Sequence, residues 1–208
     1  MKALLLLFIT LLLPGSGEKF LDEIVAYQQD SYFKQKVYEE HDWKSFYKLK
    51  EPNEIVDPNN YDLHLLNAAV FFSTNKLRDE KHLKQLSFSP SLRNAAVVHT
   101  YQMIEKKFFD HYNNKTRKLH NPDDRMRMFG AVFTASGENI DENFIPMPSA
   151  TTYVQLADKL VDDWFRSPPH KKNMMSKQFS NMGCAAMFEA KDKNGVRYVK
   201  ATQDFTEN

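Results

Sequence analysis

The hydrophobic pattern along the chain is clearest between residues 153 and 188. Apolar residues recur at helical spacing from Tyr153 to Trp164, which predicts a helix that packs along one face. Ser167-Pro168-Pro169 predicts the end of this helix, because proline donates no backbone hydrogen bond and biases the residue before it away from helical angles. We therefore expect His170 to follow directly, on irregular backbone that faces a cleft.

Three more helices are predicted earlier in the chain. Apolar positions between residues 66 and 77 share one helical face, as expected of an amphipathic helix. Ser89 followed by Pro90 is typical of a helix start, and this second helix should run to about residue 107. Asn121 and Pro122 predict a short third helix that ends before Gly130.

The remaining hydrophobic pattern predicts strands. Residues 131–140 have an extended pattern, and residues 182–190 form a nearly continuous apolar run, as in a strand covered on both faces. Asn194-Gly195 favours a tight hairpin turn, after which residues 196–205 should return as the partner strand. The order of elements predicts a single domain of mixed α and β structure, with helices flanking a sheet.

The N-terminal part of the chain divides into two segments. Lys2, a largely apolar run over residues 3–13 and small residues up to Gly17 predict a secretory signal peptide over residues 1–17. A retained anchor is the alternative, but eleven residues are too few to span a bilayer as a helix. Residues 18–60 are either an extension that packs on the domain or a partly ordered linker, and residues 61–208 form the domain itself.

Composition removes some classes of function. The 28 Lys and Arg residues balance 27 Asp and Glu residues, so no basic surface for nucleic acid is indicated. No membrane span is expected once the leader is cleaved. Cys184 is the single cysteine and cannot form an intramolecular disulfide, so stability must come from a well-packed core. Its place in an apolar strand predicts a small, inert core residue.

Three polar residues are candidates for chemistry. His111 and His170 each follow the end of an amphipathic helix, and Glu138 lies between them in the sequence. Their spacing matches no local metal motif. Two imidazoles and a carboxylate would suit zinc or a similar divalent ion, and without a metal Glu138 and His170 are the candidate catalytic pair. No obvious nucleophile joins them, because Ser167 before two prolines is better explained as a turn residue.

Eight short segments, in order along residues 62–206, resemble the CAP superfamily of cysteine-rich secretory, venom-allergen and plant pathogenesis-related proteins. The domain of this superfamily is also called the SCP domain, and the chain is most similar to the disulfide-poor bacterial branch. The segments are Asn75-Lys76-Leu77-Arg78, residues 95–103, Phe108-Phe109-Asp110-His111, Asp124-Arg125, Gly137-Glu138-Asn139-Ile140, residues 164–173, Gly183-Cys184-Ala185 and Thr202-Gln203-Asp204-Phe205.

This resemblance implies a three-layer α-β-α sandwich with a large cleft. In the family the cleft holds two histidines and two acids, and the matching residues here are His111, His170 and Glu138. The second acid, usually three residues after the motif tryptophan, falls on Ser167. The resemblance therefore implies a metal site with His111 and His170 as ligands and Glu138 in the outer shell, weakened by the missing carboxylate.

Three functions remain open at this stage. The first is a secreted protein, extracellular or periplasmic, that is not an enzyme and binds a small apolar ligand, such as a lipid, or a protein partner in its cleft. The second is a metal-dependent hydrolase, protease-like, that uses the same three residues. In the third, the cleft has no function and residues 18–60 act in an envelope assembly. His99 lies on the apolar face of its helix and is expected to be a core residue.

Overall fold

The computed structural model describes residues 17–145, 150–191 and 197–207. In this part of the chain four strands form one sheet, in the order β1-β3-β4-β2. Their bounds are β1 Ser87–Phe88, β2 Ser136–Ile145, β3 Asn181–Phe188 and β4 Arg197–Thr206. β1 is parallel to β3, whereas β4 is antiparallel to both β2 and β3.

β4 is the centre of the sheet, because β2 and β3 are joined only through it among the described strands. Gln203 of β4 lies opposite Asn139 of β2 and Cys184 of β3. Almost every residue of β3 and β4 is buried, as the apolar run over residues 182–190 predicted. The two strands pair as a hairpin would, but the Asn194-Gly195 turn itself lies outside the described residues.

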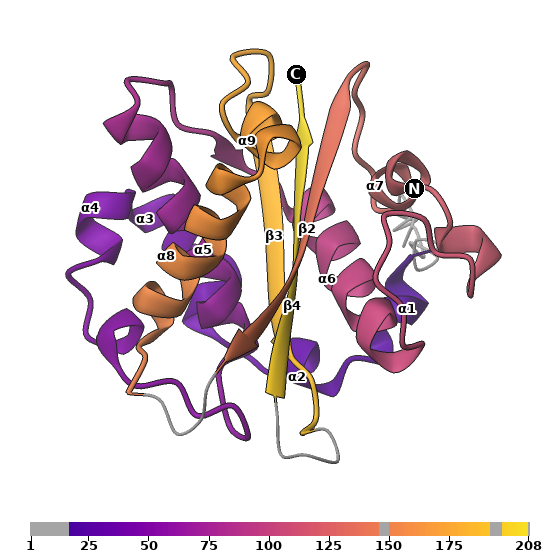
Figure 1. Ribbon diagram of the computed structural model, residues 1–208, viewed down its shortest axis with the longest axis horizontal. Coiled ribbons are helices and arrows are strands. Elements are labelled where there is room, and N and C mark those ends of the chain that lie inside the picture. Colours follow the sequence, from indigo (N-terminus) through magenta and orange to yellow (C-terminus); the bar gives the residue numbers. More distant parts are fainter. Residues whose placement is uncertain (1–16, 146–149, 192–196, 208) are drawn as a thin grey trace, which may run out of the picture.

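Helices cover both faces of the sheet (Figure 1). α5 (Leu63–Glu80) and α8 (Tyr153–Arg166) form one layer, and α6 (Pro90–Glu105) with α7 (Pro122–Met128) lies on the opposite face. The α-β-α sandwich that the family resemblance implies is therefore confirmed. Alternate residues of β4 face the two layers: Gln203 donates to Thr74 of α5, and Thr202 accepts from Thr100 of α6.

The helix ends follow the predicted signals. Ser89 accepts a hydrogen bond from the Leu92 amide and Pro90 is the first residue of α6. Asn121 caps α7 in the same way, and Gly130 adopts a left-handed φ of 92° beyond the end of that helix. In each case the cap satisfies an amide that has no partner within its helix.

Two details of the sequence interpretation were wrong. The backbone around His170 is not irregular, because a second helix, α9 (Pro168–Met174), begins directly after Ser167. Two prolines stop α8 but can open a new helix, whose first amides need no partner within it. The strand expected over residues 131–140 instead spans Ser136–Ile145, so it continues through polar positions that a strand at the edge of a sheet tolerates.

Residues 18–60 pack against both helical layers. The segment contains α1 (Glu18–Asp22), α2 (Val25–Gln28), η1 (Tyr32–Lys34), α3 (Lys36–Glu40), α4 (Trp43–Phe46) and η2 (Glu51–Asn53). Val37 and Phe46 are fully buried beside α5, while Phe20 and Ile24 join the cluster around α6. Deleting this segment would therefore remove part of the core, although the domain boundary at residue 60 stays a prediction.

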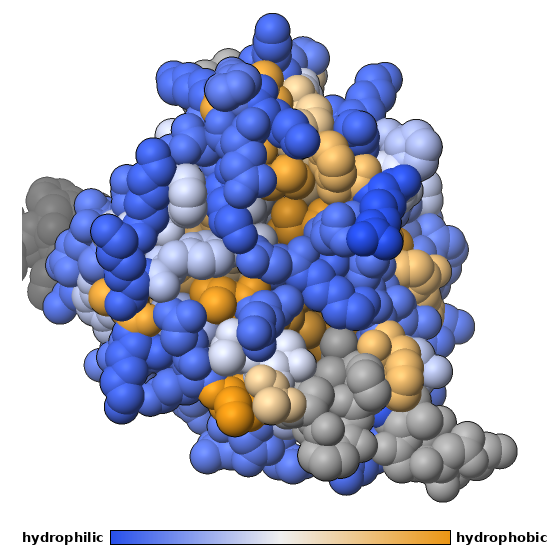
Figure 2. Space-filling view, turned by 60° about the vertical axis from the view of Figure 1, so that its left-hand side comes forward, coloured by the Kyte–Doolittle hydropathy of each residue, from blue (hydrophilic) through white to orange (hydrophobic). Residues whose placement is uncertain are grey.

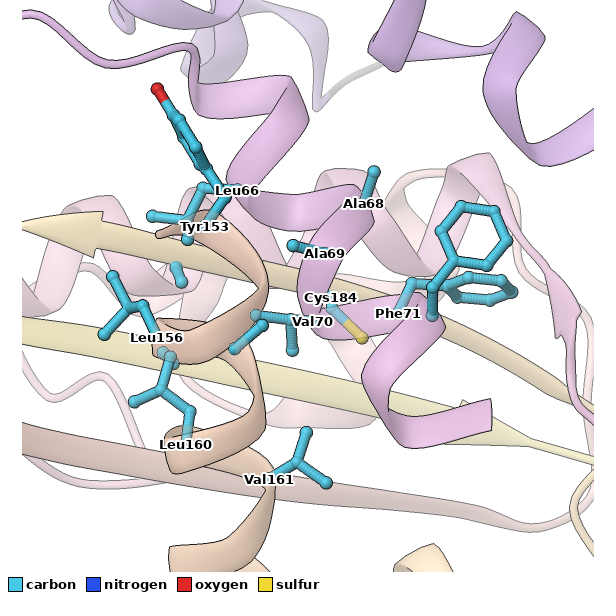
Figure 3. Close-up of a cluster of buried hydrophobic side chains, with 14 of the residues drawn as sticks. Leu66, Ala68, Ala69, Val70, Phe71, Tyr153, Leu156, Leu160, Val161 and Cys184 are labelled. Carbon is cyan, nitrogen blue, oxygen red and sulfur yellow. The ribbon is translucent and has the colours of Figure 1, made fainter. Parts of the chain in front are cut away.

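The largest apolar cluster lies between α5, α8 and the sheet. This cluster includes Leu66 and Val70 of α5, Leu156 and Leu160 of α8 and Cys184 of β3 (Figure 3). Burial raises the pKa of the Cys184 thiol well above its usual range. The thiol therefore stays protonated, and Cys184 is the small core residue that the sequence predicted.

The outer surface of the α4 and α8 side is mostly hydrophilic, with apolar side chains in separate small areas (Figure 2). No helix among the described residues has the length and apolar character needed to cross a bilayer.

Gly183 sets how closely α6 approaches the sheet. A Cβ atom at this position would overlap the main chain of Leu92 and Arg93, in the first turn of α6. We predict that Gly183→Ala lowers the free energy of unfolding by about 1–3 kcal/mol or more, because backbone cannot move aside as a side chain can. Chemical denaturation would measure the loss.

Gly137→Ala is the matched control for this substitution. Its new methyl group would meet the Asn173 and Phe179 side chains at 3.0 Å, and side chains can rotate away. Equal losses in the two variants would show that the close approach at Gly183 is not the constraint.

Candidate functional site

Glu138 is the centre of the candidate site. It lies near the start of β2, with its side chain only 3% exposed. One carboxylate oxygen accepts a hydrogen bond from His111 Nδ1 at 2.8 Å, and the other accepts from Arg125 Nη2 at 2.6 Å. Burial alone would raise the pKa of Glu138, but the charge that His99 carries at low pH, the charge of Arg125 and the two hydrogen bonds hold it well below its usual range. Glu138 is therefore an ionised carboxylate whose two oxygens are both engaged.

Arg125 fixes the backbone around this carboxylate. The side chain comes from α7 and is fully buried. Besides Glu138, it donates to the carbonyl oxygens of Leu119 at 2.8 Å and His111 at 3.0 Å. The guanidinium thus joins the loop that carries His111 to β2. The sequence placed Arg125 in a segment shared with the family but gave it no role, because its partners are distant along the chain.

His111 presents one ring nitrogen to solvent. Its Nδ1 must carry the proton that bonds to Glu138, since an ionised carboxylate can only accept. In the neutral ring Nε2 is then an acceptor, on a side chain that is 40% exposed. A carboxylate behind an imidazole fixes its tautomer and orientation, as behind many metal-binding or proton-accepting histidines.

His99 borders the same carboxylate from within the core. Its side chain is fully buried, and its Nε2 lies 3.0 Å from the Asp110 carbonyl oxygen and 3.9 Å from Glu138 Oε1. Burial lowers the pKa of His99 to about 4, so the ring is neutral at pH 7. The prediction of a core histidine is confirmed, and its position next to Glu138 was not anticipated.

Asp204 is a second buried acid that the sequence did not reveal. It lies directly opposite Glu138 in the pairing of β2 with β4, and it is fully buried. Neither of its carboxyl oxygens accepts a hydrogen bond from a described residue, but the protonated carboxyl can donate one to Glu138. Burial, the charge of Glu138 and a side-chain hydrogen bond with Glu138 raise the pKa of Asp204 well above its usual range, which leaves it protonated and uncharged. An acidic residue within an apolar strand, opposite the Gly-Glu-Asn segment, was the available signal.

His170 approaches the site from α9. Asn139 donates to its carbonyl oxygen at 3.2 Å, and Asn173 of the same helix donates to the carbonyl oxygen of Glu138 at 3.2 Å. These amides fasten α9 to β2. Partial burial and then the nearby charge of His111 lower the pKa of His170. Its imidazole makes no hydrogen bond with another described residue, so the structure joins His111 directly to Glu138 but brings His170 only into electrostatic range.

A hollow of about 450 Å³ opens beside His111 and Glu138. Its lining is predominantly polar and comes from the loop after α6, the start of α7 and the start of β2: His111, Tyr112, Asn121, Pro122, Asp123, Ser136, Gly137 and Glu138. Ser136 donates to Asp123 at 2.5 Å. The hollow can therefore offer a ligand the Nε2 atom of His111 and several hydrogen-bonding groups.

The residues present do not assemble a closed metal site. In the part of the chain that the structure describes, no group of three or more His, Cys, Asp and Glu side chains is placed to hold a metal ion. Glu138 has no free oxygen for direct coordination, and it is positioned instead to orient His111. The donors that remain are single imidazole nitrogens of His111 and His170.

This fold is that of a CAP, or SCP, domain. The family model described as "Cysteine-rich secretory protein family" matches residues 71–205 of the chain, which is more than half of it. The chain therefore belongs to the cysteine-rich secretory protein family. Its single cysteine fits a bacterial branch of the family with few disulfides.

Two relatives from Bacillus subtilis (strain 168) align with the chain. One is the uncharacterized protein YkwD, 27% identical over 110 residues, which are 53% of this chain and 38% of YkwD. The other is the uncharacterized membrane protein YlbC, 24% identical over 166 residues, which are 78% of this chain and 43% of YlbC. The chain thus spans about two fifths of the length of either relative.

Solved structures share the fold. An extracellular protein containing an SCP domain from Bacillus anthracis superimposes with a TM-score of 0.56 and 21% identity, over 74% of this chain and 44% of the other. An outer surface protein from Borrelia burgdorferi superimposes with a TM-score of 0.50 and 16% identity, over 67% of this chain and 90% of that protein. At these identities the likeness shows the fold alone.

The protonated state of Asp204 predicts a pH effect on stability. An aspartate in the unfolded chain ionises near pH 4, whereas Asp204 in the folded protein keeps its proton to a much higher pH. The unfolded state then binds fewer protons, so Asp204 makes the protein less stable as pH rises above about 4. We expect Asp204→Asn to raise the unfolding temperature at pH 7 and to reduce the wild-type loss of stability between pH 4 and pH 7.

Glu138→Gln tests the opposite dependence of stability on pH. The pKa of Glu138 is lowered in the folded protein, so its contribution is present at neutral pH and is lost on acidification. This variant should be less stable at pH 7 by about 3–5 kcal/mol, because Arg125 would remain buried without its counter-charge. Thermal unfolding across the pH range measures both variants, and a stabilised Glu138→Gln protein or a destabilised Asp204→Asn protein would contradict this account.

Proposed function

We propose that this protein is a secreted CAP-domain module that binds a protein partner or another ligand at the hollow beside His111, and that it is not an enzyme. One observation carries this proposal: both oxygens of Glu138 are engaged, by His111 and by Arg125, on a side chain that is almost fully buried. A general base needs a free oxygen within reach of the substrate. Glu138 instead serves as the anchor that orients His111.

The other polar groups at the site support binding in the same way. Asp204 is protonated and has no exposed surface, so it cannot reach a substrate. His99 is buried and neutral at pH 7. The polar lining of the hollow favours a partner that brings hydrogen-bonding groups over the wholly apolar ligand that was one expectation from the sequence.

The alternative is a metal-dependent hydrolase at the same place. The His111–Glu138 pair is the observation that favours it, because a carboxylate commonly stands behind an imidazole that binds a metal. His111 and His170 would hold the ion, with Glu138 in the outer shell, and a bound zinc ion could activate water for hydrolysis. Two imidazoles without a third protein donor predict weak retention of such an ion.

Secretion is part of the proposal. The apolar run near the N-terminus has the composition of a signal peptide, and a structural neighbour is described as an extracellular protein. YlbC, in contrast, is described as a membrane protein. Fractionation of cells that produce the full chain would locate the protein.

A zinc titration combined with a substrate screen separates the two functions. We expect calorimetry of the purified protein to show weak zinc binding that His111→Ala or His170→Ala abolishes, and no turnover of peptide or ester substrates. Both side chains are partly exposed, so these variants should fold. Zinc-dependent turnover that disappears in both variants would overturn the binding proposal in favour of a hydrolase.

Ser167→Glu tests whether Ser167 occupies the fourth corner of the family's cleft. Ser167 is half-buried between α8 and α9, and its position matches an acid in other family members. Restoring the carboxylate should tighten zinc binding by about tenfold, because an acceptor would again be available to orient an imidazole. Ser167→Gln is the uncharged control, and equal affinities in the two variants would mean that residue 167 lies outside the site.

A further inference from the structure

β2 lies at an edge of the sheet and has an unused side. It pairs with β4 along its whole length, from Ser136 opposite Thr206 to Ile145 opposite Arg197. No other described strand pairs with it. An edge strand presents main-chain N–H and C=O groups that another strand can use.

The alternation of an antiparallel ladder shows which residues carry these groups. The Glu189 amide donates to the Tyr198 carbonyl oxygen at 2.8 Å, so the main chain of Tyr198 faces β3. The next residue of β4, Val199, must then face β2, where its partner is Asn143. Odd-numbered residues of β2 therefore bond to β4, and residues 138, 140, 142 and 144 point away from the sheet.

Part of this outer side is covered and part is open. The carbonyl oxygen of Glu138 accepts from Asn173 of α9. Further along the strand, the main chain of Ile140 and Phe144 makes no hydrogen bond outside the β2–β4 ladder with any described residue. The Glu142 amide bonds to the adjacent Asp141 side chain, which leaves its carbonyl oxygen without a described partner. Glu142 and Phe144 are also exposed. We refer to residues 140–144 of β2 as the open edge.

Aromatic surface flanks one face of the open edge. Phe144 is 48% exposed and Phe109 is 46% exposed, which is unusual for side chains of this size. Phe144 lies against Tyr198, with 6.1 Å between ring centroids. Beside them is a hollow of about 790 Å³ whose walls include Phe109, Glu142 and Tyr198. A large apolar side chain on an added strand would find contacts here.

Each face of the open edge has more carboxylates than cations in its ion-pair network. On the α6 face, Lys200 is shared by Glu142 and Glu189. On the α8 face, Lys159 pairs with Asp163, and Asn143 bridges Asp141 and Asp163. Two carboxylates meet one ammonium group on either side. Lys107 and Lys191 also line the hollow on the α6 face, so it is the position directly beside Glu142, and not the hollow as a whole, that favours a positively charged group.

The same charges disfavour a second copy of this chain as the partner. Antiparallel pairing of two open edges places Glu142 opposite Glu142 in one register and Asp141 opposite Asp141 in another, whereas a register centred on Asn143 avoids both and places Glu142 opposite Phe144. Like charges directly opposite one another destabilise a strand pair, and charged residues are a common protection of sheet edges.

We propose that the open edge of β2 binds an extended peptide segment of a partner protein as an added strand. The segment carries a basic side chain beside Glu142 and an aromatic or large apolar side chain two residues away, beside Phe144. Main-chain hydrogen bonds to residues 140, 142 and 144 supply affinity, and the two side-chain positions supply selectivity. This surface is distinct from the hollow beside His111, and the inference does not depend on the function proposed for that hollow.

Amide hydrogen exchange of the full chain tests this placement directly. The probe is the capped peptide Thr-Lys-Thr-Phe-Thr-Lys-Thr, which presents the basic-to-aromatic spacing in both strand directions. At saturation we expect exchange of the amides of Ile140 and Phe144 to slow by about tenfold or more, as amides become hydrogen-bonded, with a smaller change at Glu142, whose amide already bonds to the Asp141 side chain. The amides of Asp141 and Asn143, already bonded to β4, should not change. Unchanged exchange at all three outward amides would overturn the proposal.

Reversing the charges of the probe and of Glu142 tests whether the partner segment is basic. Replacing both lysines of the probe by glutamate should weaken binding by about threefold to fivefold, and Glu142→Lys should weaken binding of the lysine probe by a similar factor. Glu142→Lys combined with the glutamate probe should restore affinity. The exposed Glu54 is a matched control site, where charge reversal should have no effect.

Blocking the main chain completes the test. Glu142→Pro removes an outward N–H while leaving the β2–β4 ladder intact, since proline is tolerated at the outer side of an edge strand. It should abolish protection by the probe, and unchanged exchange of the amides of Asp141 and Asn143 would show that the strand is still folded. Protection that persists in this variant would reject the peptide as the occupant of the open edge. Protection that appears without the probe as the protein concentration rises would also reject it, and would identify another copy of the chain as the occupant.

Discussion

The buried ion pair between Arg125 and Glu138 is the interaction on which the site depends. Arg125 is fully enclosed, and Glu138 provides its counter-charge. Because the same guanidinium also holds the carbonyl oxygen of His111, it connects α7, the loop after α6 and the first residues of β2. Removing either charge would leave the other buried without compensation, which is among the costliest changes a protein core can suffer.

Periodicity and capping residues predicted most of the fold. The helix over residues 153–166 and the caps at Ser89 and Asn121 rest on interactions within a few residues, which a sequence displays directly. α9 was missed because its two prolines signal an end and a beginning equally well. The edge position of β2 was missed because its polar residues look like loop until the pairing with β4 is known.

The site was predictable only in part, for a related reason. His111, Glu138 and His170 stood out through their resemblance to a family pattern, and the direct contact between the first two is present. Arg125 and Asp204 reach Glu138 across 13 and 66 positions of chain, through helix packing and strand register. Contacts between residues so far apart in the chain do not affect local composition. The sequence therefore could not show that both oxygens of Glu138 are hydrogen-bonded and not free to bind a ligand.

The central place of β4 has a consequence for how the domain is made. β2 and β3 are joined only through β4 in the described sheet, and every residue of β2 waits for a partner from residues 197–206. Loop closure over such separations is slow and gains nothing until the last partner arrives. During synthesis β2 therefore has no partner in the sheet until residues 197–206 have been made, so the sheet can assemble only when most of the chain is present.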